Sequence, residues 1–257
     1  MRIMRIQAIA VNTFREAIRD KILYSLLFFA LIMIGASLLL GKLALGEYTK
    51  IIMDVGLAAI SLFGTLIAIF VGITLVNKEI EKRTVYTVVS KPIRRWEFIV
   101  GKYLGLALTL FVEVVVMSIG FFLMVIYAGG SFPSILFVAI GLIYIELLFL
   151  TAIAVFFSSF STPTLSGLFT LSAYIIGHLT EDIKRFGEES ESAMVKSASE
   201  FLYYLLPNLE NFNIKNQAVH GVAIGGGEVA LVIVYGVIYI SLILFASTVI
   251  FQGRDFK

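Results

Sequence analysis

Six stretches of mostly apolar residues, each close to the length that crosses a bilayer as a helix, constrain this chain more than any other feature. A membrane helix needs about 20 such residues, and charged residues or Gly, Pro, Ser and Thr bound each stretch. Their continuous apolar runs lack the alternation of a membrane β-barrel, so helices must satisfy the backbone. We therefore predict an all-α integral membrane protein with six spans at residues 22–41, 53–76, 103–128, 135–157, 164–179 and 229–251.

The composition agrees with a bilayer as the main solvent. Of the 257 residues, 59% are hydrophobic and 15% are charged, against roughly 45–50% and about 25% in soluble domains. The mean hydropathy of +0.97 would leave more apolar surface than one core can bury. The absence of cysteine excludes a disulfide scaffold and a thiolate metal site. The net charge of +2 gives no argument for nucleic acid, and we expect none as a partner.

The positive charges predict the orientation. With six spans, 14 lysines and arginines fall on the side that holds both termini and 6 fall on the other. Cytoplasmic loops carry the excess of Lys and Arg. Both termini are therefore expected in the cytoplasm of a multi-pass protein of the plasma (inner) membrane.

Residues 1–21 predict an amphipathic helix rather than a cleaved signal, because the apolar run that follows is of full span length. Apolar side chains gather on one arc and cations on the other. Such a helix lies in the headgroup plane and faces anionic lipid; the alternative is a soluble helix that packs on a partner subunit. The cations expected to anchor the chain at the membrane surface, here and after the second span, are Arg2, Arg5, Arg15, Arg19, Arg94 and Arg95.

The only sizeable polar region is residues 180–228, which we expect to be an extracytoplasmic loop with an acidic balance. Within it, residues 198–206 have apolar positions at helical spacing and stop at Pro207. This pattern predicts a short helix on or in the outer membrane face. The loop is too short and too polar for a soluble domain of its own.

Between the second and third spans, residues 77–102 read NKEIEKRTVYTVVSKPIRRWEFIVGK. This segment resembles the cytoplasmic signature of the ATP-binding-cassette type 2 permeases: a Glu-x-Glu pair, a Thr, a short apolar helix, a Ser-x-Pro turn, a basic and aromatic patch and a Gly-Lys. Arg83 stands where many members have Gly. The resemblance covers the whole chain, and residues 206–212 are similar to the branch that includes the permease of the nitrous oxide reductase maturation transporter.

The resemblance implies a single transmembrane permease domain over residues 1–257, which would be the membrane subunit of an exporter. It implies a separate cytoplasmic ATPase subunit and a second permease copy or homologue, with spans two and five at the interface. The sequence has no Gly-x-x-x-x-Gly-Lys-Ser/Thr motif, so ATP and Mg²⁺ are expected on the partner and no cofactor or enzyme activity in this chain. The residues expected to couple to the ATPase, within the coupling loop of residues 77–102, are Glu79, Glu81, Thr84, Val85, Tyr86, Val88, Ser90 and Pro92.

The residues of the coupling loop suit that role physically. The β-branched run after Thr84 is a weak helix former, but Thr84 can cap a turn and Pro92 ends it. Glu79 and Glu81 are placed to pair with basic groups of the ATPase. The alternative is an ordinary solvated loop whose cations only set the topology.

Two carboxylates fall near the middle of spans three and four. Glu113 and Glu146 each cost about 2.5–3.5 kcal/mol on insertion scales, so each is expected to face protein. Glu113 shares a helical face with Gly101, Gly105 and Thr109, and small residues mark helix contacts; Gly56, Gly64, Ala68 and Gly72 form a similar row in span two. Either the carboxylates line a transport route or sense a proton, or they are structural groups that tie helices together.

His178 and His220 are the only histidines, and both are expected near the outer face in plain surface roles, because the ligand set for a metal is poor. Two other classes of function stay open. One is a proton- or ion-coupled secondary carrier that uses Glu113 and Glu146, although no internal repeat supports it. The other is a non-transporting membrane scaffold or enzyme, although no catalytic cluster is apparent.

Overall fold

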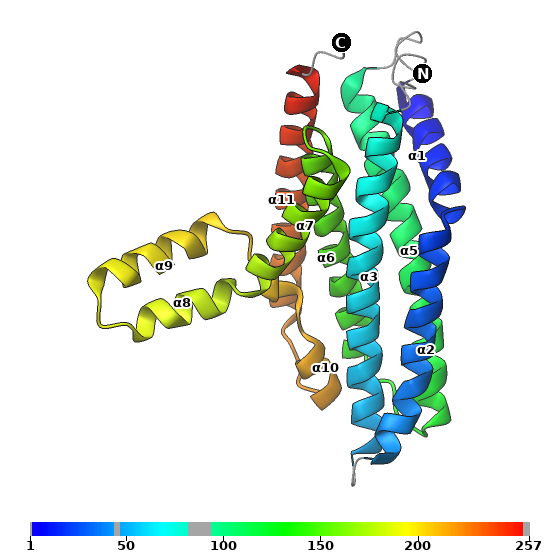
Figure 1. Ribbon diagram of the computed structural model, residues 1–257. Helices are drawn as coiled ribbons and strands as arrows, with labels where there is room; N and C mark the ends of the chain where they lie inside the picture. The colour runs from blue at the N-terminus through cyan, green and yellow to red at the C-terminus, as the bar shows by residue number, and fades with distance from the viewer. Residues whose placement is uncertain (1, 44–46, 82–93, 254–257) are drawn as a thin grey trace.

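The computed structural model describes residues 2–43, 47–81 and 94–253, and all regular structure in these ranges is helical (Figure 1). The α-helices pack as a bundle around an apolar core, with a hairpin of two short helices projecting from it. In chain order the elements are α1 (Arg2–Ile18), α2 (Lys21–Leu43), α3 (Tyr48–Glu81), α5 (Arg95–Tyr127), α6 (Ile135–Ser158), α7 (Pro163–His178), α8 (Thr180–Glu189), α9 (Ala193–Leu205), the 3-10 helix η1 (Glu210–Phe212), α10 (Lys215–His220) and α11 (Gly226–Gly253).

Five of the described helices are long and apolar enough to cross a membrane: α2, α3, α5, α6 and α11. The chain is thus a multi-pass, all-helical membrane protein. The expected span at residues 164–179 coincides with α7, which has 16 residues. At 1.5 Å per residue such a helix reaches about 24 Å, less than the roughly 30 Å of hydrocarbon, so a count of six spans stays a prediction.

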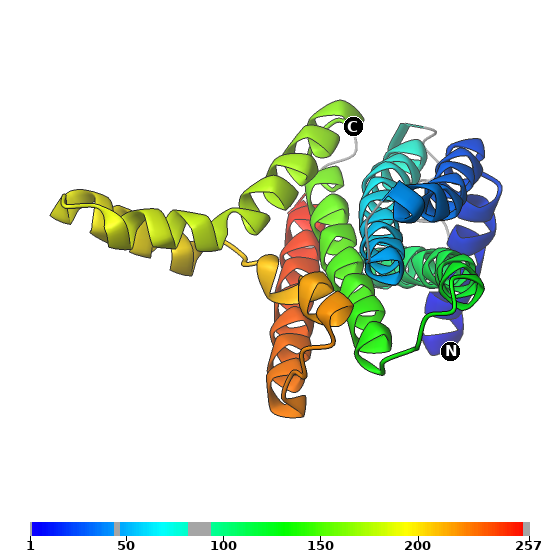
Figure 2. The ribbon, with the colours of Figure 1, turned by 90° about the horizontal axis from the view of Figure 1, so that it is seen from below.

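Small residues set the closest helix contacts. A Cβ on Gly56 of α3 would lie 2.2 Å from the Phe121 ring of α5, and one on Gly64 would lie 2.6 Å from Leu147 of α6. Helices can approach this closely only where a side chain is missing. In this way α3 packs against both α5 and α6, while α2 packs on α3 and α11 packs on α6 (Figures 1 and 2).

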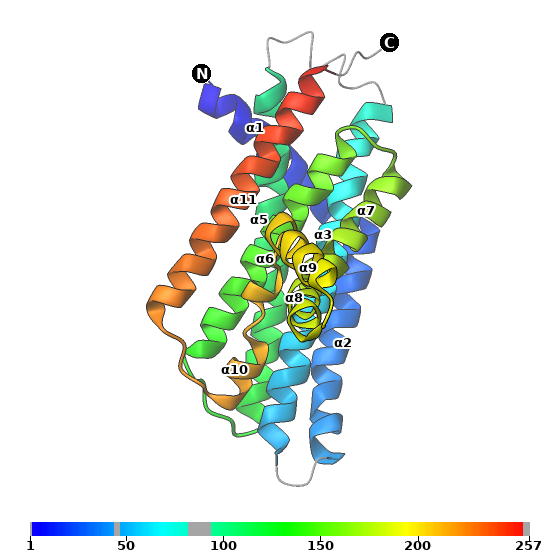
Figure 3. The ribbon, with the colours of Figure 1, turned by 90° about the vertical axis from the view of Figure 1, so that its left-hand side faces the viewer.

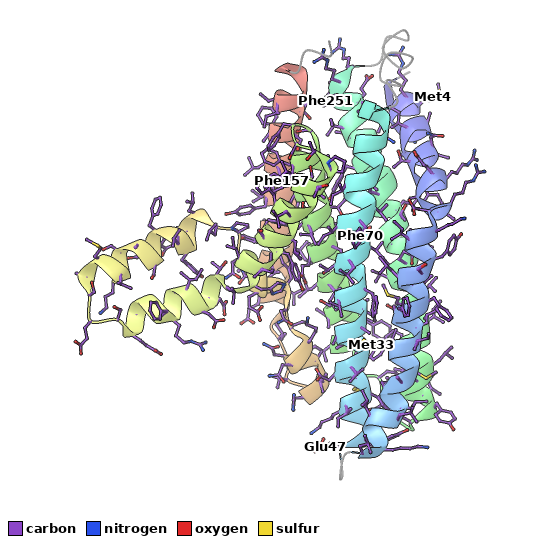
Figure 4. All side chains as sticks on the ribbon, in the orientation of Figure 1. Met4, Met33, Glu47, Phe70, Phe157 and Phe251 are labelled. Carbon is purple, nitrogen blue, oxygen red and sulfur yellow. The ribbon has the colours of Figure 1, made fainter. Side chains whose placement is uncertain are left out.

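Two residues, Arg19 and Asp20, separate α1 from α2. The Oδ1 of Asp20 accepts a hydrogen bond of 3.0 Å from the backbone N–H of Ile22, which is the bonding of a helix N-cap. α1 packs mainly on α5, whereas α2 packs mainly on α3. Met4 of α1 and Phe251 of α11 lie at one end of the bundle, and Glu47 lies at the other (Figure 4).

α8 and α9 form a hairpin that stands away from the bundle (Figures 1 and 3). The two helices pack on each other, and Gly187 allows the approach because a Cβ there would lie 2.4 Å from the Cβ of Ser199. Large apolar side chains such as Phe186, Met194 and Phe201 are exposed on the hairpin. The short helix expected at residues 198–206 is the second half of α9, which starts earlier, at Ala193.

Candidate functional site

The expected coupling residues Thr84, Val85, Tyr86, Val88, Ser90 and Pro92 lie outside the described residues. Glu79 and Glu81 belong to the end of α3, but their side chains, like that of Arg2, lie outside the described part. The structure does describe α5, the helix that follows the loop, from its first residue, Arg95.

The start of α5 is fixed by its own residues and by α11. The N–H of Arg94 donates to Glu97 Oε2 at 3.0 Å, and Glu97 is buried. Arg95 Nη1 donates to the carbonyl oxygen of Phe251 at 2.9 Å, and the rings of Phe98 and Phe251 stack with centroids 5.8 Å apart. An arginine that donates to a backbone carbonyl near a helix C-terminus stabilises that end. The first turn of α5 and the last turns of α11 are thereby joined.

α1 lies along the next turns of α5. A Cβ on Gly101 would lie 2.8 Å from the Ile9 side chain, and one on Gly105 would lie 2.6 Å from the carbonyl oxygen of Ala10. Lys102, between these glycines, is 1% exposed, and its Nζ lies 3.7 Å from Glu16 Oε2. The two glycines of the expected interface thus meet the N-terminal helix, which the sequence pattern did not identify as their partner.

The arginines expected to anchor the chain at the membrane surface differ in exposure. Arg15, Arg19 and Arg94 are exposed, whereas Arg5 and Arg95 are half-buried. Arg95 is bonded to α11 as described above. A headgroup-plane location for α1 stays a prediction, while its packing against α5 is a property of the fold.

Glu113 and Thr109 lie further along α5 and are both buried. The Oγ1 of Thr109 donates back to the carbonyl oxygen of Gly105 at 3.0 Å. The Thr109 side chain borders a small apolar void that Gly72 of α3 and Thr151 of α6 also line. Thr109 therefore faces α3 and α6, whereas Gly101 and Gly105 face α1. Glu113 is 5% exposed, and its Oε2 has no hydrogen-bond partner among the described residues.

The main polar site of the described chain is a cluster of Glu146, His178 and Glu210, at the place where α7 ends. His178 Nε2 lies 2.8 Å from Glu146 Oε1, and His178 Nδ1 lies 2.8 Å from Glu210 Oε2. The side chain of Glu146 is 2% exposed, that of His178 18% and that of Glu210 32%. The ring of Tyr174 packs edge-on against the imidazole, with centroids 4.7 Å apart. His178 is therefore a bridging group inside the fold, and the expectation of a plain surface role was wrong.

Proton counting limits the charge of the Glu146–His178–Glu210 cluster. A carboxylate only accepts, and a neutral imidazole donates from one nitrogen alone. Two short contacts to carboxyl groups thus require either an imidazolium between two carboxylates or a neutral imidazole with one carboxyl group protonated. In both arrangements the cluster carries one net negative charge. A proton can therefore pass between the imidazole and a carboxylate of the cluster without movement of the heavy atoms.

The cluster lies where the α8–α9 hairpin leaves the bundle and returns. The N–H of Leu209 donates to the carbonyl oxygen of Gly177 at 3.0 Å, and a Cβ on Gly177 would lie 2.6 Å from the Leu209 side chain. Thr180 Oγ1 lies 3.5 Å from the carbonyl oxygen of Pro207, and Asn213 Nδ2 donates to Glu210 Oε1 at 2.7 Å. The hairpin is thus held closed at its base, next to a carboxylate from the middle of α6.

Comparison with protein-family models decides the family. Residues 7–256 match the model of the ABC-2 family transporter protein. The chain belongs to the ABC-2 transporter family. The match covers most of α1, all five long helices and the hairpin. ABC-2 permeases are normally non-catalytic membrane subunits that work with an ATP-binding-cassette ATPase subunit. The curated proteins include no significant match to this chain.

Sequence reasoning for this ABC-2 chain identified Glu146 but not its partners. Glu210 counted only toward the acidic balance of the loop, and His178 was placed at the surface. A usable signal was present, because His178 ends the span that follows the one carrying Glu146, and Glu210 lies in the polar loop directly after it. Such a carboxylate is expected to have a partner, and His178 is the closest basic group at the outer end of the neighbouring helix.

Proposed function

We propose that this chain is the permease subunit of an ATP-driven exporter, in which two permeases work with two copies of a separate ATPase. ATP and Mg²⁺ belong to the ATPase, and this subunit carries neither a cofactor nor a catalytic group. Both termini and the coupling loop of residues 77–102 lie on the cytoplasmic side of the inner membrane. The branch we favour is the one that includes the permease of the nitrous oxide reductase maturation transporter.

One structural observation supports the proposed coupling mechanism. The helix that follows the coupling loop contacts two other elements within its first turns. Arg95 donates a hydrogen bond to α11, Lys102 forms an ion pair with α1, and Gly101 and Gly105 pack closely against α1. A displacement of the loop by the ATPase would therefore move α1, α5 and α11 together. Such rigid-body movement of packed helices is a common form of conformational switching.

The low number of buried charges and the acidic outer loop favour a hydrophobic or amphiphilic cargo that moves outward. Glu113 and Glu146 are the candidate pathway groups. If Glu113→Gln and Glu146→Gln leave transport and stimulated ATP hydrolysis unchanged, these carboxylates have no part in the pathway.

Co-expression with a candidate ATP-binding-cassette ATPase subunit, followed by co-purification, tests the core proposal. We expect the wild-type chain to retain the ATPase, and Glu79→Lys with Glu81→Lys to reduce the retained amount and the ATP hydrolysis, since opposite charges at such interfaces favour association. Glu189→Lys makes the same change on the exposed end of α8 and should retain wild-type levels. The proposal fails if no ATPase associates, or if replacing residues 84–90 leaves ATP hydrolysis unaffected.

A proton-coupled carrier is the second candidate, favoured by the bonded Glu146–His178–Glu210 cluster at the end of α7. It predicts uptake or efflux that follows an imposed proton gradient in proteoliposomes containing this chain alone. Transport that needs both ATP and the ATPase, and ignores the gradient, eliminates it.

A further inference from the structure

The α8–α9 hairpin leaves the bundle at the level of the middle of a membrane-spanning helix. At its base, His178 Nε2 lies 2.8 Å from Glu146 Oε1, and Glu146 is the twelfth of the 24 residues of α6. α6 is long and apolar enough to cross a membrane. The middle of such a helix lies near the centre of the hydrocarbon layer, so the base of the hairpin lies there too.

The exposed apolar side chains of the other spanning helices support this depth. Leu43 at the end of α2, Ile126 near the end of α5 and Phe137 near the start of α6 are all exposed, and in spanning helices such side chains face lipid. These helix ends lie closer than the hairpin base to the end of the bundle that holds Glu47 (Figure 1). Phe137 precedes Glu146 by nine residues, which is about 14 Å along a helix. Hydrocarbon therefore extends past the level of the hairpin base.

The hairpin is too polar to be surrounded by lipid at this depth. Residues 181–200 hold six carboxylates and three basic groups, so pairing within the hairpin would still leave three carboxylates over. The ion pair between Lys184 and Glu188 is long, at 3.9 Å, and lies at the surface. Charged groups at the bilayer centre are costly, and they face protein or a water-filled cavity. All of these charged residues except Lys184 are exposed: Glu181, Asp182, Arg185, Glu188, Glu189, Glu191, Lys196 and Glu200.

A second protein molecule is needed to keep lipid away from the hairpin. The hairpin projects sideways beyond the helices of its own bundle (Figures 1 and 2), so these helices do not cover it. Water at this depth needs a protein wall on its far side, because polar groups in the hydrocarbon region occur only inside protein or around a water-filled cavity. Phe186, Met194 and Phe201 are exposed on the same hairpin, and aromatic residues and Met are enriched in protein interfaces.

We propose that the α8–α9 hairpin packs on a second copy of this chain, and that the two hairpins line a water-filled space between the copies at mid-membrane depth. In a symmetric pair each hairpin contacts the other copy in the same way. Phe186, Met194 and Phe201 contact the second copy, while the carboxylates face the water. The inference rests on the pairing of two permeases in the proposed function, and it adds the segment that makes the contact.

Photo-crosslinking of the full chain in vesicles of palmitoyl-oleoyl phosphatidylglycerol tests the contact. A benzophenone amino acid in place of Phe186 or Phe201 should give a covalent dimer of the chain. The same amino acid in place of Leu39, an exposed apolar residue of α2, should give lipid adducts and is the matched control. Lipid adducts without dimer at positions 186 and 201 overturn the proposal. If position 168 of α7 still gives dimer in that case, the pairing of permeases stands and only the hairpin contact fails; a monomer mass throughout refutes both.

Thiol labelling tests the water, and the chain has no cysteine of its own to interfere. A charged maleimide that does not cross membranes, added to intact vesicles, should label Glu189→Cys in the chains whose outer side faces the reagent. Leu39→Cys is the control and should react only after detergent is added, because its side chain faces lipid. Glu189 and Leu39 are both exposed positions, so the two substitutions test the surroundings and not the folding of the chain. Labelling of Glu189→Cys that also requires detergent would show that no water reaches the hairpin, and the proposal would be wrong.

Discussion

The cluster of Glu146, His178 and Glu210 predicts a large and specific effect of removing the imidazole. In His178→Leu, Glu146 loses its 2.8 Å contact with Nε2 while its side chain stays 2% exposed. Breaking a buried charged pair from one side costs about 3–5 kcal/mol. Glu210 is 32% exposed and keeps Asn213 as a donor, so its loss adds only about 0–1 kcal/mol. The total effect is about 3–6 kcal/mol of unfolding free energy.

Thermal unfolding of the purified protein in detergent measures this effect. At about 2–4 °C per kcal/mol for a chain of this size, His178→Leu should lower the Tm by roughly 6–24 °C. His220→Leu is the matched control, because His220 is exposed and its Nδ1 lies 2.9 Å from the backbone carbonyl oxygen of Asn216, with no buried carboxylate involved. Exposed substitutions usually change stability by about 0.5 kcal/mol or less, so its Tm should stay within about 2 °C of the wild type.

The double variant Glu146→Leu, His178→Leu separates a lost partner from a lost contact. Replacing both partners by apolar groups removes the buried unpaired carboxyl group, which is the main source of the penalty. The double variant should therefore be more stable than His178→Leu alone. A wild-type Tm for His178→Leu, or additive losses in the double variant, would show that the imidazole does not hold Glu146 and would refute the reasoning.

Three further predictions concern helix contacts. Gly105→Ala should destabilise the chain by about 1–3 kcal/mol, because its Cβ would meet the backbone of α1. Protease cleavage within α1 should therefore become faster. In the control Gly141→Ala the new Cβ meets nothing within 4 Å, so this variant should be neutral or more stable by about 0.5–1 kcal/mol. Gly177→Ala should cause a similar loss through Leu209, seen as faster hydrogen exchange at the Leu209 amide. Arg95→Ala should remove one donor from the carbonyl oxygen of Phe251 and speed amide exchange in the last turn of α11, whereas Arg95→Lys should restore part of the protection. Unchanged exchange in Arg95→Ala would contradict a stabilising role for this hydrogen bond.

The rows of small residues show what the sequence could predict about helix contacts and what it could not. Spacing alone indicated that Gly101 and Gly105 lie at a helix contact, because a missing side chain leaves room for another backbone. It gave no information on which helix fills that room. In the structure Gly101 and Gly105 meet α1, while Thr109 on the same predicted face borders a void next to α3 and α6. A helix face wide enough to touch several neighbours cannot be assigned to one of them by periodicity.

The sequence by itself determined the membrane class, the long helices and the presence of a costly carboxylate in the middle of α6. These follow from local composition, since apolar length and charge decide insertion segment by segment. Only the tertiary structure decided the partners. Glu146 and His178 are 32 residues apart, His178 and Glu210 are again 32 apart, and Arg95 and Phe251 are 156 apart. Such pairs form because bundle packing brings distant segments together, and no local pattern encodes which segments become neighbours.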